Sequence, residues 1–144
     1  MSNTYVWQKD DWHDFSYDKN RLGKLEKRFL HSSSILIGAQ KKLSSQEKEE
    51  IKISFLSNEA LNTSKIEGEI LNRKSLQSSI KQYFQLKTPV SKQYPRENGM
   101  AKMMVDLYLH YKTPLSQKML FSWHQMIMNG RTDLESVGQY RSHE

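Results

Sequence analysis

The sequence contains no cysteine, only three prolines and six glycines in 144 residues, and no long apolar run. Without cysteine the chain can have no disulfide framework, no thiol nucleophile and no cysteine-ligated zinc or iron–sulfur site. Its apolar runs are far shorter than the ~20 residues that span a bilayer, so no membrane partner is expected. The first residues show no basic start followed by an apolar stretch, so we expect no secretory signal and a cytoplasmic location.

The surplus of positive charge is moderate, with 22 basic and 16 acidic residues and a formal net charge of +6. Such a charge suits nucleic acid or an acidic surface. However, the basic residues alternate with acidic ones, as at Lys24, Glu26 and Lys27, and no block of five like charges occurs. We therefore expect the lysines to solvate helix faces. A nucleic-acid-binding helical module stays a lesser alternative, favoured only if the lysines gather on one face.

The scarcity of proline and glycine predicts long helices, and no long alternating run indicates a sheet. We therefore predict an all-α bundle of about five or more helices. The first helix should cover about residues 18 to 41, after an aromatic N-terminal arm. Its apolar residues recur every three or four positions, with one gap: Leu22, Leu25, Phe29 and Leu36. The arm contains Trp7, Trp12, Phe15 and Tyr17.

A capping box predicts where the second helix begins. Ser44 and Glu47 have the spacing at which each side chain satisfies a free backbone N–H, and the helix should run to about Ile66. A third helix should begin after the cap residue Asn72 and end before the break at Thr88-Pro89. Its apolar residues are Leu76, Ile80, Tyr83 and Phe84.

The second half of the chain should contain two more helices. The stretch from Val90 to Arg96 is expected to be a loop. The fourth helix should bury Met100, Met103, Met104, Leu107 and Tyr111, with the methionines filling the core. The fifth should begin at about Ser116 and stop at Gly130, before a polar, loop-like end. It carries Leu120, Trp123 or His124, Ile127 and Met128.

The usual catalytic patterns are missing from the sequence. The glycines lie too far apart to form a phosphate-binding loop, and no two histidines are three or four residues apart on a helix. His143-Glu144 has the first two letters of a zinc-binding HExxH motif but follows a loop. The serines from Ser32 to Ser34 lack the flanking glycines of a nucleophile elbow. From the residues alone no catalytic centre is predicted.

The predicted end of the second helix is unusual. The stretch from Thr63 to Gly68 reads Thr-Ser-Lys-Ile-Glu-Gly, in which Gly68 can take the left-handed conformation that closes a helix. Glu67 then lies in the last turn, where the helix dipole disfavours an anion by roughly 0.3–1 kcal/mol. Thr63 lies one turn back on the same face. Either Glu67 pairs with an arginine elsewhere, or Lys65 and solvent neutralise it.

This stretch resembles the inhibitory motif of the Fic family of protein AMP-transferases, [Ser/Thr]-x-x-x-Glu-[Gly/Asn], in the type whose inhibitory helix precedes the catalytic core. The aromatic segment from Tyr5 to Asp18 is similar to the one that precedes many bacterial Fic cores. Residues Leu120 to Met128 and the segment Gly138-Gln139-Tyr140-Arg141 resemble the first core helix and the start of the flap, a hairpin that docks the target protein. The resemblance covers nearly the whole chain in family order.

The resemblance implies two regions and a regulatory role. Residues 1–95 would be the Fic-associated helical region with the inhibitory helix, and residues 96–144 the first helices of the core and the start of the flap. Its inhibitory residues would be Thr63, Ser64, Glu67 and Gly68, and its target-docking residues Gly138, Tyr140 and Arg141. Glu67 would occupy the arginine that should hold the γ-phosphate of ATP, and so block productive binding.

The family's catalytic signature, HxFx[D/E]GNGRxxR, is absent from the sequence. The resemblance implies ATP and Mg²⁺ for the full-length enzyme and neither for this chain alone, so we expect a truncated, inactive portion of a longer protein. Its partners would be the remainder of the Fic core and a target protein bearing a hydroxyl group, and the resemblance admits a homodimer. The alternative from another class is a free-standing helical inhibitor that presents Glu67 in trans to a separate Fic toxin.

Overall fold

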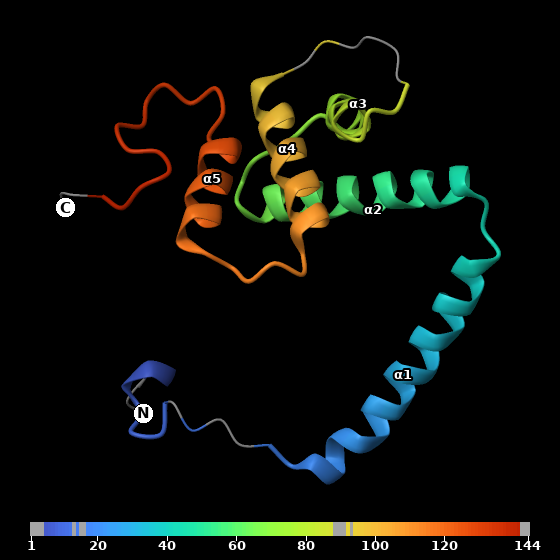
Figure 1. The fold of residues 1–144 in the computed structure, drawn as a ribbon. Coiled ribbons are helices and arrows are strands. Elements are labelled where there is room, and N and C mark those ends of the chain that lie inside the picture. The colour runs from blue at the N-terminus through green and yellow to red at the C-terminus, as the bar shows by residue number, and fades with distance from the viewer. Residues whose placement is uncertain (1–4, 13, 15–16, 88–91, 93, 142–144) are drawn as a thin grey trace. The chain divides into compact units, whose positions relative to one another are not determined.

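The computed structural model describes residues 5–12, 14, 17–87, 92 and 94–141. These residues form one short 3-10 helix, five α-helices and no strand (Figure 1). They are η1 (Val6–Gln8), α1 (Lys19–Lys41), α2 (Ser45–Ile66), α3 (Arg73–Tyr83), α4 (Pro95–His110) and α5 (Gln117–Ile127). The all-α prediction is therefore confirmed, and the five predicted helices are found close to their predicted positions. Phe15, Thr88-Pro89 and His143-Glu144, which entered the sequence analysis, lie outside the described residues.

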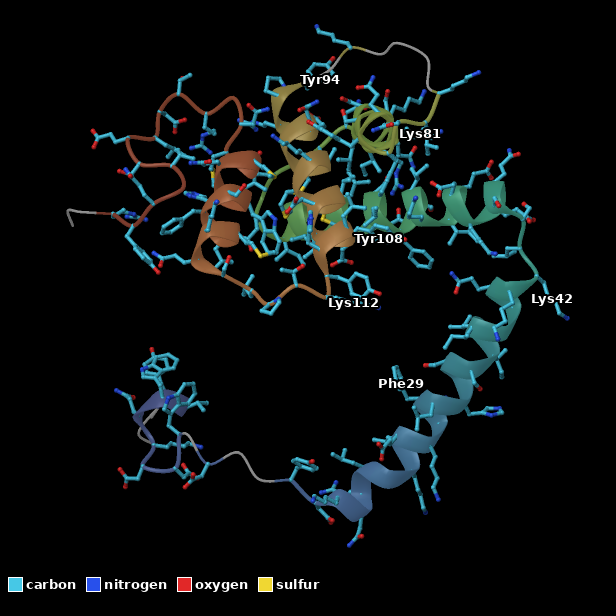
Figure 2. All side chains as sticks on the ribbon, viewed as in Figure 1. Phe29, Lys42, Lys81, Tyr94, Tyr108 and Lys112 are labelled. Carbon is cyan, nitrogen blue, oxygen red and sulfur yellow. The ribbon has the colours of Figure 1, made fainter. Side chains whose placement is uncertain are left out.

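The chain divides into two compact units, Met1–Ser44 and Ser45–Glu144. In the first unit α1 begins at Asp18, whose carboxylate accepts a hydrogen bond from the backbone N–H of Asn20 at 2.9 Å. No residue of α1 is buried. Its apolar residues, from Leu22 at 43% to Leu36 at 72%, are exposed, and Figure 2 shows Phe29 projecting from the helix. The helical spacing was predicted correctly, but the described residues do not cover the apolar stripe.

The core of the second unit forms between α2, α3 and α4. Figure 1 shows α3 nearly end-on beside α2 and α4. The buried apolar residues are Ile53, Ala60, Leu76, Ile80, Ala101, Met104 and Val105. Several small polar residues are buried with them, and Ser57 satisfies its hydroxyl by donating to the Ile53 carbonyl of its own helix at 2.6 Å. The small side chains allow the helices to approach closely.

The buried face of α4 differs from the predicted one. Met104 is buried and Met100 and Met103 pack against the core, so the methionines fill the core as predicted. Leu107 and Tyr111, in contrast, are 39% and 70% exposed, so their predicted burial was wrong. The buried residues are instead Glu97, Gly99, Ala101, Met104 and Val105. Because the apolar residues of α4 cover a wide arc, either of two faces could be buried. Contact with α3 buries the face that carries the small residues.

The start of α4 was also misplaced in the prediction. The helix begins at Pro95, within the stretch expected to be a loop. Proline is well tolerated in the first helical turn, because the N–H that it lacks would have no partner there. The predicted cap of α3 is confirmed, since the Asn72 side chain accepts a hydrogen bond from the Ser75 N–H at 3.0 Å.

The helix α5 packs against α4 along one side. The indole N–H of Trp123 donates to the Asp106 carboxylate of α4 at 2.7 Å. Gly99 of α4 lies so close to the end of α5 that a Cβ atom built on it would be 1.9 Å from the Met126 carbonyl oxygen. Leu120, which the sequence pattern placed on the apolar side, is 48% exposed. Among the helices of the described residues, none has the length and apolar character needed to cross a membrane.

Candidate functional site

The end of α2 is closed by backbone hydrogen bonds, as the sequence predicted. The last helical residue is Ile66, and Gly68 has a φ of +81°. The N–H of Gly68 donates to the Lys65 carbonyl at 3.1 Å, and the N–H of Glu69 donates to the Ser64 carbonyl at 2.8 Å. This pair of bonds is the Schellman arrangement that a left-handed glycine permits. Glu67 is therefore the residue at which the helix ends.

The Glu67 side chain is exposed at this helix end. Its backbone N–H donates to the Thr63 carbonyl at 3.2 Å, which anchors the residue to the preceding turn. The Glu67 carboxylate forms no ion pair or hydrogen bond with any other described residue, including Lys65. The carboxylate thus lies at the negative end of the helix dipole, where an external cation would be favoured.

The two other polar residues of the motif have different surroundings. Thr63 is exposed, and it contacts Glu67 through its backbone carbonyl rather than its side chain. Ser64 is 3% exposed, and its hydroxyl has no hydrogen-bond partner among the described residues. Ser64 therefore faces the helix packing, while Glu67 and Thr63 face outward.

Two acidic side chains hold the segment after α2 against the first turn of α4. The Arg96 guanidinium pairs with the Glu69 carboxylate at 2.7 Å. The backbone N–H of Asn72 donates to Glu97 Oε1 at 2.8 Å, and Glu97 is only 7% exposed. These bonds join residues 25 to 27 positions apart. Sequence reasoning missed them, because no helical or strand spacing relates their partners.

The turn after α5 lies near the same charges. The Arg131 guanidinium donates to both carboxylate oxygens of Asp133, at 2.7 and 2.6 Å. These hydrogen bonds, together with a backbone hydrogen bond and the smaller effects of the Arg131 and Arg96 charges, lower the pKa of the Asp133 carboxyl to about 2. Asp133, followed by Glu69, raises the pKa of Arg131. The α2 end, the α4 start and the turn after α5 therefore form one electrostatically coupled region.

The Arg131–Asp133 ion pair predicts how stability depends on pH. Because the folded pKa of Asp133 is depressed, its stabilising contribution is present above the ordinary aspartate pKa of about 3.9 and is lost as the pH falls through about 2. The side-chain ¹³C NMR titration of Asp133 should show a midpoint near 2 in the native protein. In Arg131→Gln the midpoint should return toward its ordinary value. Lys118→Gln removes a charge elsewhere and should leave the midpoint in place; a native midpoint near 4 would contradict the prediction.

The segment that resembles the start of the flap lies against α5. Gly138 has a φ of +71°, and its backbone N–H donates to His124 Nδ1 at 2.9 Å. The Tyr140 ring meets the Phe121 ring edge-on, with 5.1 Å between the ring centres. Tyr140 is nevertheless 74% exposed, and Arg141 is exposed as well. Of the three residues predicted to dock a target, Tyr140 and Arg141 are therefore exposed, while Gly138 is half-buried against α5.

A groove of about 570 Å³ lies between α2 and α4 and was not predicted from the sequence. It is lined by Phe55, Leu56, Glu59, Met104, Leu107, Tyr108 and Tyr111. Lys52 lies at 3.9 Å over the Phe84 ring and 5.6 Å from the Tyr108 ring centre, which places a cation on these aromatic faces. Figure 2 labels Tyr108 on the side of α4 toward α2.

The described residues contain no group of three or more histidine, aspartate or glutamate side chains that could hold a metal ion.

Residues 5–86, more than half of the chain, match the model of a family described as a domain of unknown function (DUF4172). No curated protein matches the chain.

Proposed function

The chain belongs to the family described as a domain of unknown function (DUF4172), and from that premise we propose that it is the regulatory helical portion of a Fic-type protein adenylyltransferase. Glu67 is the residue that keeps the enzyme inactive. The enzyme would transfer AMP from ATP to the hydroxyl group of a serine, threonine or tyrosine in a target protein. The proposal places the protein in the cytoplasm, where ATP is available.

The observation that carries the proposal is the exposed Glu67 carboxylate at a closed helix end. An anion at this end is disfavoured by the helix dipole and has no partner among the described residues that would compensate it. An arginine brought to this position could accept the carboxylate through two charge-assisted hydrogen bonds. The arginine that binds the γ-phosphate in the resembled family is such a group. While it is paired with Glu67, it is not free to hold phosphate.

The bonds around Glu67 support the same proposal. Inhibition requires the backbone that carries the carboxylate to be held at a defined place, because a mobile segment loses more entropy on pairing. The Schellman bonds close the helix at Gly68, the residue after Glu67. The Glu69–Arg96 and Asn72–Glu97 bonds attach the following segment to α4. By the resemblance α4 lies at the start of the catalytic core, so these bonds would orient Glu67 toward the core.

ATP would supply the AMP group and Mg²⁺ the charge neutralisation of the phosphates. The residues that hold them belong, by the resemblance, to the catalytic signature that this sequence lacks. In this proposal the inhibitory helix therefore holds a carboxylate where it competes with the γ-phosphate, and it takes no part in the transfer itself. The boundary between regions 1–95 and 96–144 stays a prediction.

The alternative of a free-standing inhibitor uses the same carboxylate in trans. It has no need for the segment from Gly138 to Arg141, because a flap docks a target protein and an inhibitor modifies none. This segment is bound to α5 with two exposed side chains. Its arrangement favours a portion of an enzyme over a separate inhibitor.

The nucleic-acid alternative has one observation in its favour. Arg21, Lys24 and Arg28 of α1 are spaced by three and four residues and so share one helix face. The same helix places apolar residues on its neighbouring face, which is the ordinary pattern of an amphipathic helix. Because the pattern has this general explanation, nucleic-acid binding stays the lesser alternative.

A transfer assay tests the proposed function directly. The 144-residue chain alone, incubated with labelled ATP, Mg²⁺ or Mn²⁺ and a cell lysate, should label no protein, because the base, the metal ligand and the phosphate site of the family lie in the missing signature. The same chain joined to a Fic catalytic core that carries the signature should label weakly. Labelling that follows the purified chain through chromatography would contradict the proposal.

A further inference from the structure

One hydrogen bond of unusual type joins α5 to the segment that follows it. The backbone N–H of Gly138 donates to the ring nitrogen Nδ1 of His124 at 2.9 Å, between half-buried residues that are 14 positions apart. A backbone amide can only donate, so His124 Nδ1 must be the acceptor. The neutral ring therefore carries its proton on Nε2. This bond sets both the tautomer of His124 and the course of the chain at Gly138.

Two further contacts hold the same segment to the same side of α5. Gly138 has a φ of +71°, and a Cβ atom built on it would lie 2.4 Å from Cγ of Gln125. The Tyr140 ring meets Phe121 edge-on at 5.1 Å. Phe121, His124 and Gln125 are spaced by three and four residues along α5, so they form one continuous strip. Gln125 lies against the Cα of Gly138, His124 accepts from the Gly138 amide, and the Phe121 ring contacts the Tyr140 ring.

We propose that His124 is a positioning residue that fixes where the segment from Gly138 to Arg141 leaves α5, and so presents Tyr140 and Arg141 to a protein partner. The nature of that partner rests on the proposed function, in which the segment begins the target-docking flap. The hydrogen bond between Gly138 and His124 does not depend on the proposed function. Phe121 guides the Tyr140 ring, but a ring contact alone allows sliding along the helix. The directional bond to Gly138 selects one register.

The test uses NMR on the 144-residue chain. In the native protein a scalar coupling should be observed across the hydrogen bond, between the amide ¹⁵N of Gly138 and ¹⁵Nδ1 of His124. The His124 ring nitrogens should show the tautomer protonated on Nε2. Both are measured without any substitution, so they do not depend on whether a variant folds. Absence of the coupling together with the opposite tautomer would overturn the proposal.

Three variants separate positioning from packing. His124→Phe keeps a ring but removes the acceptor, and should raise the hydrogen-exchange rate of the Gly138 amide about twofold to tenfold. It should also weaken the magnetisation transfer between the Tyr140 and Phe121 rings. His124→Asn places an amide oxygen near the position of Nδ1, and should restore much of the protection. His31→Phe makes the same change on exposed α1 and should have no effect.

The outcomes distinguish this proposal from the proposed function. Equal Gly138 exchange in the native protein and His124→Phe would overturn the positioning role, whatever happens in a transfer assay. If the coupling and the rescue by His124→Asn are observed, the positioning role holds even if Glu67 proves to have no inhibitory effect. In that case the segment from Gly138 to Arg141 is positioned as proposed, and only the inhibitory role of Glu67 is lost.

Discussion

Replacing Glu67 by glycine should raise AMP transfer at least tenfold when this chain is joined to a Fic catalytic core that carries the signature. The substitution removes the carboxylate that is proposed to hold the phosphate-binding arginine. Gly68, with its φ of +81°, still ends the helix, and the backbone bonds to Lys65 and Ser64 do not involve the Glu67 side chain. The fold should therefore survive. The measurement is self-labelling and target labelling with labelled ATP at matched folded fraction.

Two free energies bound the expected increase in AMP transfer. If the inhibited state dominates by 99 to 1, inverting the ratio requires about 5.5 kcal/mol. One hydrogen bond to a charged group contributes ~1.5–3 kcal/mol, which corresponds to roughly tenfold or more. Full inversion therefore needs both oxygens of Glu67 on the guanidinium, with repulsion of the ATP phosphates adding the rest. Glu67→Gln, which keeps one acceptor and loses the charge, should fall between the native protein and Glu67→Gly.

Thr63→Ala is the matched control in the same turn. Thr63 supports Glu67 through its backbone carbonyl, and its side chain is exposed. Because alanine keeps that carbonyl, the activity should change in the same direction but much less. Equal activity in the native protein and Glu67→Gly would remove the inhibitory role. Equal increases in Glu67→Gly and Thr63→Ala would indicate general loosening of the helix end instead.

Gly99→Ala should lower the free energy of unfolding of the second unit by about 1–3 kcal/mol or more. The added Cβ would lie 1.9 Å from the Met126 carbonyl oxygen and 2.8 Å from the Asn129 Cβ. Both are parts of the chain at the end of α5, so neither can rotate away, and α4 and α5 must separate. Urea unfolding followed by circular dichroism and by Trp123 fluorescence measures the loss.

Gly38→Ala provides the control for this change. Gly38 lies inside α1, and a Cβ there would meet no atom within 4 Å. Alanine should therefore increase the stability of that helix by roughly 1 kcal/mol, because glycine is a poor helix former. The unfolding midpoint of the second unit should not move. A Gly99→Ala protein as stable as the native one would show that α4 and α5 do not pack as described.

The positions of the helices and of their ends could be read from the sequence, because these signals are local. The three- and four-residue spacing of apolar residues predicted α1 to α5 within a few positions. Asn72 was predicted as a cap and does accept the Ser75 N–H. Gly68 was predicted to close α2, and its φ of +81° does so. Each of these depends on atoms within about one helical turn, so neighbouring residues are enough to decide them.

Which side of each helix is buried was decided by tertiary packing. On α4 the sequence offers Leu107 and Tyr111 on one side and a side with Gly99, Ala101 and Val105 on another, and only contact with neighbouring helices selects between them. On α1 a well-formed apolar stripe is exposed, from Leu22 to Leu36. Periodicity shows that a helix has an apolar face, but not whether another element of the chain covers it.

The polar bonds that organise the candidate site were also beyond the sequence. Glu69 meets Arg96 across 27 positions, Asn72 meets Glu97 across 25, and Gly138 meets His124 across 14. No periodic pattern relates such partners, and each donor or acceptor has many equivalent residues along the chain. The local motif determined that Glu67 would end a helix. The packing of α4 decided which side chains hold the segment after that end, and the packing of the C-terminal segment on α5 decided the His124–Gly138 bond, because only folding brings distant residues within hydrogen-bond distance.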